Sequence, residues 1–236
     1  MRSEPTAEPH SRRPEVGAVI VAAGRGRRMA GVDKLLAPLA GRPLLAHTLA
    51  AFQACPSVER VALVMAGERL EDGRDLVRAH GFDKVAALCQ GGERRQDSVR
   101  AGLEALGVCE WAVVHDGARP LVTPRLIEDG LAAARETGAA ICAVPLSDTI
   151  KQVTASGEVE RTLERQGLWL VQTPQVFRYD LLLEAHRRAT AEATDDAALV
   201  EAMGGRVRVY MGSPRNIKVT TPEDLALAEA LMRQET

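Results

Sequence analysis

The strongest constraint on the fold is a regular alternation of short apolar runs with longer segments in which apolar residues recur every three to four positions. Short apolar runs predict buried strands, and the longer period predicts amphipathic helices. Strands that alternate with helices form a parallel or mostly parallel sheet flanked by helices. We therefore expect an α/β, Rossmann-like fold. The expected strands cover residues 16–21, 60–64, 84–88, 111–115 and 139–144, and the expected helices cover residues 44–54, 67–79, 96–106 and 124–136.

One segment, residues 147–167, interrupts this alternation, and we expect it to project as a β-hairpin arm. Within it, residues 149–154 and 158–163 alternate in the manner of strands around a turn at Ser156-Gly157. An isolated two-stranded hairpin is marginal in water, so the arm should pack against something. The pattern leaves its own domain and a second copy of the chain equally open. After the arm we expect helices at residues 179–191 and 195–203, a strand at 206–210 and a last helix from Pro222.

Length and composition favour a single folded domain. The 236 residues suffice for one sizeable core, which we place at residues 16–236. Residues 1–15 mix Pro, Ser, Glu and Arg without a buried-face pattern, and we expect them to form a disordered leader. The net charge of -2 argues against a general nucleic-acid binder. No apolar stretch reaches the ~18 to 20 residues of a membrane span.

Cysteine usage points to a reducing compartment. The four cysteines are far apart and form no C-x-x-C pair, which argues against a zinc ribbon and against a disulfide framework. We therefore expect a cytoplasmic protein that binds neither nucleic acid nor a membrane.

The first expected strand runs into a loop rich in small and cationic residues. The loop comprises Ala22, Ala23, Gly24, Arg25, Gly26, Arg27, Arg28 and Met29, followed by Lys34. Parallel sheets bind ligands outside the carboxyl ends of their strands, and small residues let backbone N–H groups approach phosphate oxygens. A tight turn with solvated arginines would explain a bare G-x-G, but not four cations within ten residues of a nearly neutral chain. Met29 stands where the dinucleotide fingerprint has its third glycine, and the P-loop pattern is absent. We predict a phosphate site of neither type.

Asp116 follows another expected strand, so it should lie on the same sheet edge as this loop. A carboxylate beside polyphosphate is repelled unless a cation lies between them or substrate hydroxyls donate to it. Asp116 is therefore a candidate ligand of Mg²⁺ or of a sugar hydroxyl, and the alternative is an aspartate that caps the following turn. We interpret the preceding His115 as structural.

A second glycine-containing segment, residues 91–98, opens an expected helix and suits base and ribose contacts. A plain helix N-terminus explains this segment as well. The remaining candidates would be unremarkable singly. They are Arg119, Thr149, Arg165, Thr173, Thr194 and Lys218.

Taken together and in this order, these segments resemble the 2-C-methyl-D-erythritol 4-phosphate cytidylyltransferase family of isoprenoid precursor synthesis. The resemblance runs from Val16 to Met232. It implies transfer of CMP from CTP to the methylerythritol phosphate with release of pyrophosphate, Mg²⁺ as cofactor, and a homodimer whose arm reaches the partner's active site. Three positions depart from the usual pattern, Arg25, Gly117 and Asp196, and none removes a proposed catalytic group.

The resemblance also implies roles for single residues. Arg28 and Lys34 match cations that stabilise the transition state, and Arg165 and Lys218 match the pair that positions the acceptor phosphate. The matched nucleotide positions are Ala22, Ala23, Gly24, Gly92 and Ser98, and the matched acceptor positions are Asp116, Arg119 and Thr149. We add Gly26, Arg95, Thr173 and Thr194 to the expected substrate-binding set.

The implied reaction is an electrostatic problem. A phosphate monoester is largely dianionic at pH 7, since its second pKa is ~6, so its attack needs no general base. Two unit charges ~4 Å apart interact by roughly 4 kcal/mol at an effective dielectric of 20, and cations must cancel such repulsions.

Two alternative enzyme functions remain open. One is a cytidylyltransferase for another polyol phosphate such as ribitol 5-phosphate, and the other is an NAD-binding oxidoreductase, against which the missing third glycine argues. Retention of all the proposed cations disfavours a non-catalytic binding module.

Overall fold

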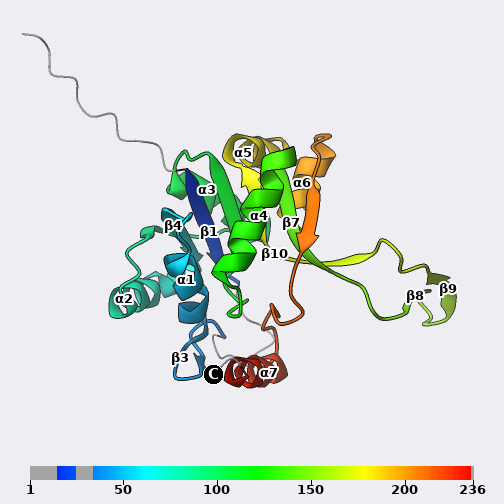
Figure 1. Ribbon diagram of the computed structural model, residues 1–236, viewed down its shortest axis with the longest axis horizontal. Coiled ribbons are helices and arrows are strands. Elements are labelled where there is room, and N and C mark those ends of the chain that lie inside the picture. The colour runs from blue at the N-terminus through cyan, green and yellow to red at the C-terminus, as the bar shows by residue number, and fades with distance from the viewer. Residues whose placement is uncertain (1–14, 25–33, 235–236) are drawn as a thin grey trace, which may run out of the picture.

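The computed structural model describes residues 15–24 and 34–234 of the chain. A seven-stranded sheet lies at its centre, with the strand order β11-β7-β10-β6-β1-β4-β5 (Figure 1). Parallel pairs join β1 to β4 and β6, β4 to β5, and β7 to β11, whereas β10 is antiparallel to both of its neighbours. The expected mostly parallel sheet is therefore confirmed. The strands are β1 (Val16–Ala22), β4 (Arg60–Met65), β5 (Val85–Gln90), β6 (Trp111–Asp116), β7 (Ala139–Pro145), β10 (Trp169–Arg178) and β11 (Arg208–Met211).

Alternating side chains along the strands build one hydrophobic core on each face of the sheet. In β1, Ala18 and Ile20 face one core, while Val19 faces the other. Helices α1, α2, α4 and α7 contribute to the first core, and α3, α5 and α6 contribute to the second. The helices are α1 (Leu44–Ala54), α2 (Leu70–His80), α3 (Arg95–Leu106), α4 (Pro124–Thr137), α5 (Tyr179–Arg188), α6 (Asp196–Ala202) and α7 (Pro222–Arg233), and a 3₁₀ turn at Gly67–Arg69 precedes α2.

Local sequence explains where several helices begin. Thr123 accepts a hydrogen bond from the Leu126 N–H and is followed by proline, which presets the helical φ at the start of α4. The side chain of Asp195 caps α6 in the same way by accepting from the Ala198 N–H. No helix in the described part of the chain is long and apolar enough to cross a bilayer.

Strand β10 was not expected from the sequence. Pro174 lies in the middle of it, and proline normally argues against a central strand because it cannot donate a hydrogen bond to a neighbour. The structure accommodates Pro174 at a register shift between Val171 and Gln175 in the pairing with β7. As a result, β10 inserts between β6 and β7 and brings Thr173 behind the end of β6.

The hairpin is confirmed as β8 (Ile150–Val153) and β9 (Val159–Leu163), which form a separate two-stranded sheet. Figure 1 shows this arm standing away from the body of the molecule. A second small sheet, β2 (Pro38–Leu39) with β3 (Arg42–Pro43), precedes α1. The expected leader, apart from Glu15, lies outside the described residues.

Candidate active site

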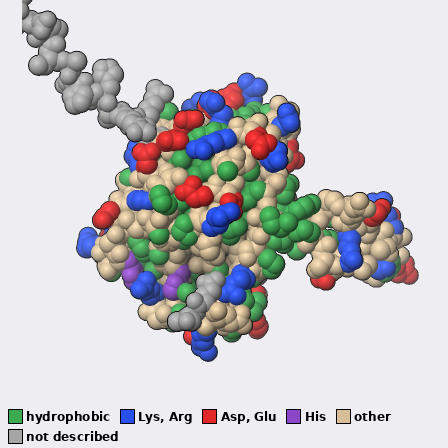
Figure 2. All heavy atoms as spheres, viewed as in Figure 1, with side chains coloured by type: hydrophobic (Ala, Val, Ile, Leu, Met, Phe, Trp, Pro, Cys, Tyr) green, Lys and Arg blue, Asp and Glu red, His purple; other side chains and the backbone are tan. Residues whose placement is uncertain are grey.

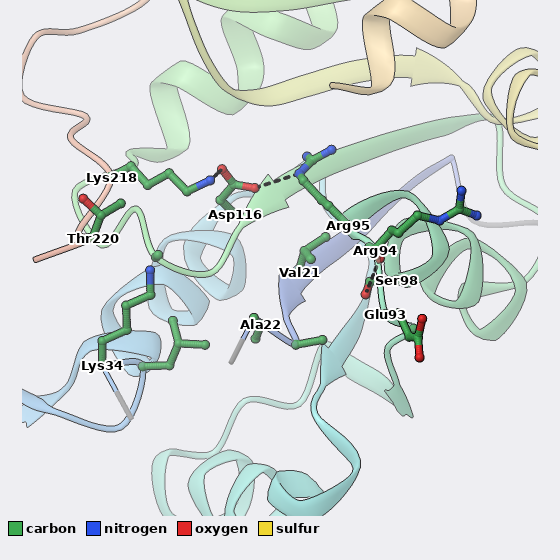
Figure 3. A pocket seen from close by; sticks show the side chains of 15 residues that line it. Val21, Ala22, Lys34, Glu93, Arg94, Arg95, Ser98, Asp116, Lys218 and Thr220 are labelled. Atoms are coloured by element: carbon green, nitrogen blue, oxygen red, sulfur yellow. Dashed lines mark hydrogen bonds and ion pairs between the residues drawn. The ribbon is translucent and has the colours of Figure 1, made fainter. Parts of the chain in front are cut away.

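A pocket of about 740 Å³ opens at the carboxyl ends of the central strands. It lies where β1 and β6 end, beside the segment that joins β5 to α3 (Figure 3). This is the edge of a parallel sheet at which ligands bind. The lining residues are Val21, Ala22, Ala23, Gly24, Lys34, Leu35, Gly92, Glu93, Arg94, Arg95, Ser98, Asp116, Ala118, Lys218 and Thr220.

Small residues bring two loops close together on one side of the pocket. A Cβ on Gly91 would lie 2.3 Å from the Cβ of Ala23 and 2.6 Å from the Oγ of Ser98. Only glycine at this position therefore allows the loop after β1 to approach the start of α3. Two expected residues of the first loop, Gly26 and Arg28, lie outside the described residues.

Cations surround the Asp116 carboxylate. The Nζ of Lys218 lies 2.8 Å from one of its oxygens, the Nε of Arg95 lies 3.2 Å from the other, and the Nε of Arg119 lies 3.8 Å away. Burial alone would raise the pKa of Asp116, but Arg95 and Lys218 hold that pKa well below its usual range. Asp116 is therefore an ionised carboxylate that holds a lysine and an arginine in place, as Figure 3 shows.

The segment that precedes α7 brings the two candidate lysines, Lys34 and Lys218, to the same pocket. The Nζ of Lys34 donates to the carbonyl of Val219 over 2.9 Å, so it is held next to Lys218. The Val219 N–H in turn donates to the carbonyl of Ala118, just beyond Asp116. Residues from three distant parts of the chain thus meet at one pocket, as the phosphate-binding hypothesis requires.

Arg119 and Thr173 lie behind the pocket and support it. Arg119 is largely buried and donates to the carbonyl of Asn216 over 2.7 Å, which ties the Lys218 segment to the turn after β6. Thr173 is buried on β10, and its hydroxyl oxygen accepts the Asp116 N–H over 3.0 Å. Both residues were expected to contact substrate, but in the described structure neither lines the pocket.

His115 is a structural residue, as the sequence suggested. It is fully buried, and its ring lies against Phe52. The Thr173 hydroxyl, having accepted the Asp116 N–H, can donate to His115 Nδ1 at 3.0 Å. The Nε2 proton then points to the carbonyl of Arg119 at 3.3 Å. Burial lowers the pKa of His115 to about 3, so the ring is neutral at pH 7.

This buried histidine predicts a loss of stability in acid. In the unfolded chain its pKa returns to about 6.5, so between pH 6.5 and 3 the unfolded chain binds a proton that the folded chain excludes. The free energy of unfolding must therefore fall as the pH falls through this window. We expect a loss of about 2 kcal/mol between pH 7 and 5, because the slope approaches roughly 1.4 kcal/mol per pH unit once the pH is below 6.5.

Urea unfolding of the wild-type protein and of His115→Gln, each at pH 7 and pH 5, measures this contribution. Glutamine retains hydrogen-bonding groups but does not titrate, so the variant should lose less stability than the wild type over the same interval. Equal losses in the two proteins would show that His115 does not carry the effect.

Three other expected residues lie away from the pocket. Thr149 is exposed at the start of the arm, and Thr194 is exposed just before α6. Arg165 lies at the base of the arm, where its guanidinium donates to the carbonyl of Ser147. Within one chain these side chains are not among the lining residues.

Several residues that line the pocket were not predicted from the sequence. Leu35, Glu93, Arg94, Ala118 and Thr220 each lie within two positions of a residue that was chosen. The predicted residues beside them belong to the same loops that line the pocket. Periodicity and composition could not show how much of each loop faces the pocket.

The pocket suits a divalent cation that arrives with polyphosphate. Among residues 15–24 and 34–234, no three His, Cys, Asp or Glu side chains cluster where they could hold a metal ion. The carboxylates in the lining are Asp116, which is ionised, and Glu93. Mg²⁺ commonly takes one or two carboxylates together with substrate phosphates rather than a cage of protein ligands. The described residues fit such an ion, with Asp116 as the candidate protein ligand.

Comparison with known proteins gives one consistent result. The family model of 2-C-methyl-D-erythritol 4-phosphate cytidylyltransferase (IspD) matches residues 16–234. A protein of that name from Dehalococcoides mccartyi strain CBDB1 is 55% identical over 220 residues, which cover 93% of this chain and 97% of the relative. The crystal structure of the enzyme of that name from Thermus thermophilus is 37% identical with a TM-score of 0.75, covering 91% of this chain and 98% of the other. The 4-diphosphocytidyl-2C-methyl-D-erythritol synthase structure from Anaerococcus prevotii DSM 20548 has a TM-score of 0.82 at 29% identity, covering 93% and 96%.

Proposed function

The chain belongs to the 2-C-methyl-D-erythritol 4-phosphate cytidylyltransferase family and transfers CMP from CTP to 2-C-methyl-D-erythritol 4-phosphate, and on this premise we propose how its residues carry out the reaction. The observation that supports the proposal most strongly is the convergence of Lys34 and Lys218 at one pocket beside the ionised Asp116. Two anionic reactants need such a concentration of positive charge. The substrate experiment also tests the two alternatives, an NAD-binding oxidoreductase and a cytidylyltransferase for another polyol phosphate.

The nucleotide binds along the small-residue side of the pocket. Ala23 and Gly24 expose backbone after β1, and Gly92 and Ser98 flank the start of α3. Backbone N–H groups at a helix N-terminus and in a glycine loop favour anionic oxygens. We place the triphosphate there, next to Lys34, and the cytidine against Gly92 and Ser98.

The acceptor binds on the opposite side, beside Asp116 and Lys218. An oxygen of its phosphate attacks the α-phosphorus of CTP, the bond from that phosphorus to the bridging β-phosphate oxygen breaks, and pyrophosphate leaves with the electron pair. Lys34 and Arg28 stabilise the charge that develops at the α-phosphate. Lys218 holds the attacking phosphate, and Asp116 fixes Lys218 and accepts hydrogen bonds from acceptor hydroxyls.

We propose Mg²⁺ as the cofactor, which would arrive with the triphosphate and for which Asp116 would be the protein ligand. When bound, the ion supplies Lewis-acid charge that partly neutralises the triphosphate. The protein's own contribution is to orient the reactants and to place the charges of Lys34 and Lys218 in the pocket.

We also propose that the active unit is a homodimer joined through the arm. The start of β10 carries exposed apolar side chains, and Leu170 is 53% exposed. Val171 on β10 and Met211 on β11 both pair with Ala143 of β7, so they lie in one row across the sheet, and Met211 is 59% exposed. Figure 2 shows apolar side chains gathered where the arm leaves the body. An exposed apolar patch of this kind suits burial against a second copy, which would bring Thr149 and Arg165 to the partner's pocket.

A cytoplasmic location completes the proposal. All four cysteines are free thiols, and the burial of Cys55, Cys109 and Cys142 raises each of their pKa values to about 11. Free, unreactive thiols suit a reducing compartment, in which CTP is also available.

The substrates can be identified by offering each of the four nucleoside triphosphates with methylerythritol phosphate and weighing the products. We expect a diphosphocytidyl product and pyrophosphate with CTP alone, because the chain belongs to a cytidylyltransferase family. Ribitol 5-phosphate serves as the competing acceptor, and a reaction without acceptor is the blank. Faster turnover with ribitol 5-phosphate, or binding of NAD in place of CTP, would contradict the assignment.

A further inference from the structure

A chain of buried charged groups runs from the pocket into the helical layer behind it. Arg95 lines the pocket and donates its Nε to Asp116 over 3.2 Å. Its Nη1 donates to Asp196 over 2.7 Å. The other oxygen of Asp196 lies 3.0 Å from Nε2 of His186. Neither Asp196 nor His186 lines the pocket, and the reaction described above uses neither of them.

The outer members of this chain are deeply buried. The side chain of Asp196 is 1% exposed and that of His186 is 0% exposed. Burial by itself would raise the pKa of Asp196, but Arg95 and His186 lower it, so Asp196 is an ionised acceptor. An ionised carboxylate can only accept, and the Nε2 of His186 must therefore carry the proton in this bond. The histidine fixes the carboxylate from the side opposite Arg95.

Arg95 needs this anchor because of its place on α3. It is the first residue of the helix, at the end where the helix dipole is positive and disfavours a cation. Two carboxylates offset that effect, and together they raise the pKa of Arg95 above its ordinary value despite burial. Asp196, in contrast, is the first residue of α6, where a negative charge is favoured. The α6 terminus thus supplies a fixed anion that holds the Arg95 guanidinium in one orientation.

The orientation of Arg95 matters because Arg95 and Lys218 are the two nearest of the cations that share the Asp116 carboxylate. One Asp116 oxygen faces Arg95 and the other faces Lys218. If Arg95 swings away, Asp116 attracts Lys218 more strongly, and Lys218 becomes less available to the acceptor phosphate. If Arg95 stays in place, Lys218 is shared between Asp116 and the substrate.

From this geometry we infer that His186 and Asp196 are positioning residues for CMP transfer, acting through Arg95 and Asp116 on Lys218. The inference rests on the proposed function and adds two residues, on α5 and α6, that touch no substrate. Their loss changes the use of the acceptor rather than the binding of CTP.

The test compares His186→Leu with His186→Gln. Leucine fills the buried space but donates no hydrogen bond, whereas glutamine has an amide N–H that can reach Asp196. We expect His186→Leu to lower kcat/KM for the acceptor roughly ten- to a hundredfold, the range for loss of a hydrogen bond to a charged group. His186→Gln should recover most of that loss. The CTP dissociation constant, titrated without acceptor, should stay within about threefold in both variants.

A double-mutant cycle with Arg95→Ala distinguishes positioning from a general loss of structure. Without Arg95, His186→Leu should have little further effect on kcat/KM, because the link to the pocket is already broken.

Leu182→Ala is the matched control, since Leu182 is also fully buried on α5 and its loss should lower stability without changing kinetics. If His186→Leu does not fold, Asp196→Asn carries the same comparison. The inference is overturned if the folded variant has wild-type acceptor kinetics, or if the same fold-loss persists in the Arg95→Ala background. The wild-type protein is assayed in parallel. If it transfers CMP, the proposed function holds, and either of these outcomes then contradicts only the positioning role of His186 and Asp196.

Discussion

Lys34→Ala is expected to lower kcat for CMP transfer by about two to three orders of magnitude, the effect of removing one preorganised charge from a transition state. Lys34 lines the pocket, and its hydrogen bond to the Val219 carbonyl fixes it beside Lys218. The negative charge at the α-phosphate grows as the acceptor attacks, so this lysine binds the transition state more tightly than the ground state. The affinity for CTP should therefore change only a few-fold.

The measurement is pyrophosphate release at saturating CTP and acceptor, together with a CTP titration of each variant. Lys84→Ala is the matched control. Like Lys34, Lys84 donates its Nζ to a backbone carbonyl, that of Cys55, but it does not line the pocket. Its loss should leave kcat unchanged. Wild-type turnover in Lys34→Ala, or a loss confined to CTP affinity, would remove Lys34 from the catalytic set.

The sequence predicted the fold well because the pattern of burial follows the topology. β1, β4, β6 and β7 are nearly continuous apolar runs, which is what a central strand covered on both faces requires. Their carboxyl ends had to share one edge, so Gly24 and Asp116 could be expected at the same site before any contact was known. The arm was predicted because its strands alternate instead of running apolar.

β10 could not be predicted in this way, since its pairing depends on partners distant in sequence. Pro174 argued against a strand, and only the register shift opposite β7 makes room for it. Thr173 was expected to contact substrate, whereas its hydroxyl accepts the Asp116 N–H from the neighbouring strand. His186 was missed for a similar reason. A histidine on an amphipathic helix carries no signal until tertiary packing places Asp196 against it.

Arg165 also could not be placed from one chain, and its position leads to the second large expected effect. The arm stands away from the body of its own chain, and Arg165 does not line that chain's pocket. If Arg165 acts in the partner's pocket, Arg165→Ala should reduce kcat/KM for the acceptor by at least about tenfold, since it removes a charged phosphate contact. CTP affinity should be unaffected. Arg161→Ala is the matched control on the same arm, because Arg161 is bound to Gln152 within the hairpin.

A mixed dimer turns this into a decisive measurement. In a dimer of one Lys34→Ala subunit and one Arg165→Ala subunit, one pocket lacks both groups, while the other combines an intact Lys34 with the partner's intact Arg165. The two variant chains, co-expressed with different tags and purified as the heterodimer, are assayed at an acceptor concentration well below KM, where each parent has little activity. The heterodimer should then show about half of the wild-type activity, because one of the two sites of a symmetric dimer is restored. If Arg165 acted within its own chain, each pocket of the heterodimer would keep one lesion and no activity would return. A heterodimer as inactive as its parents would therefore rule out the shared site. A protein that stays monomeric would rule it out as well, and the exposed apolar side chains at the base of the arm would then need another partner.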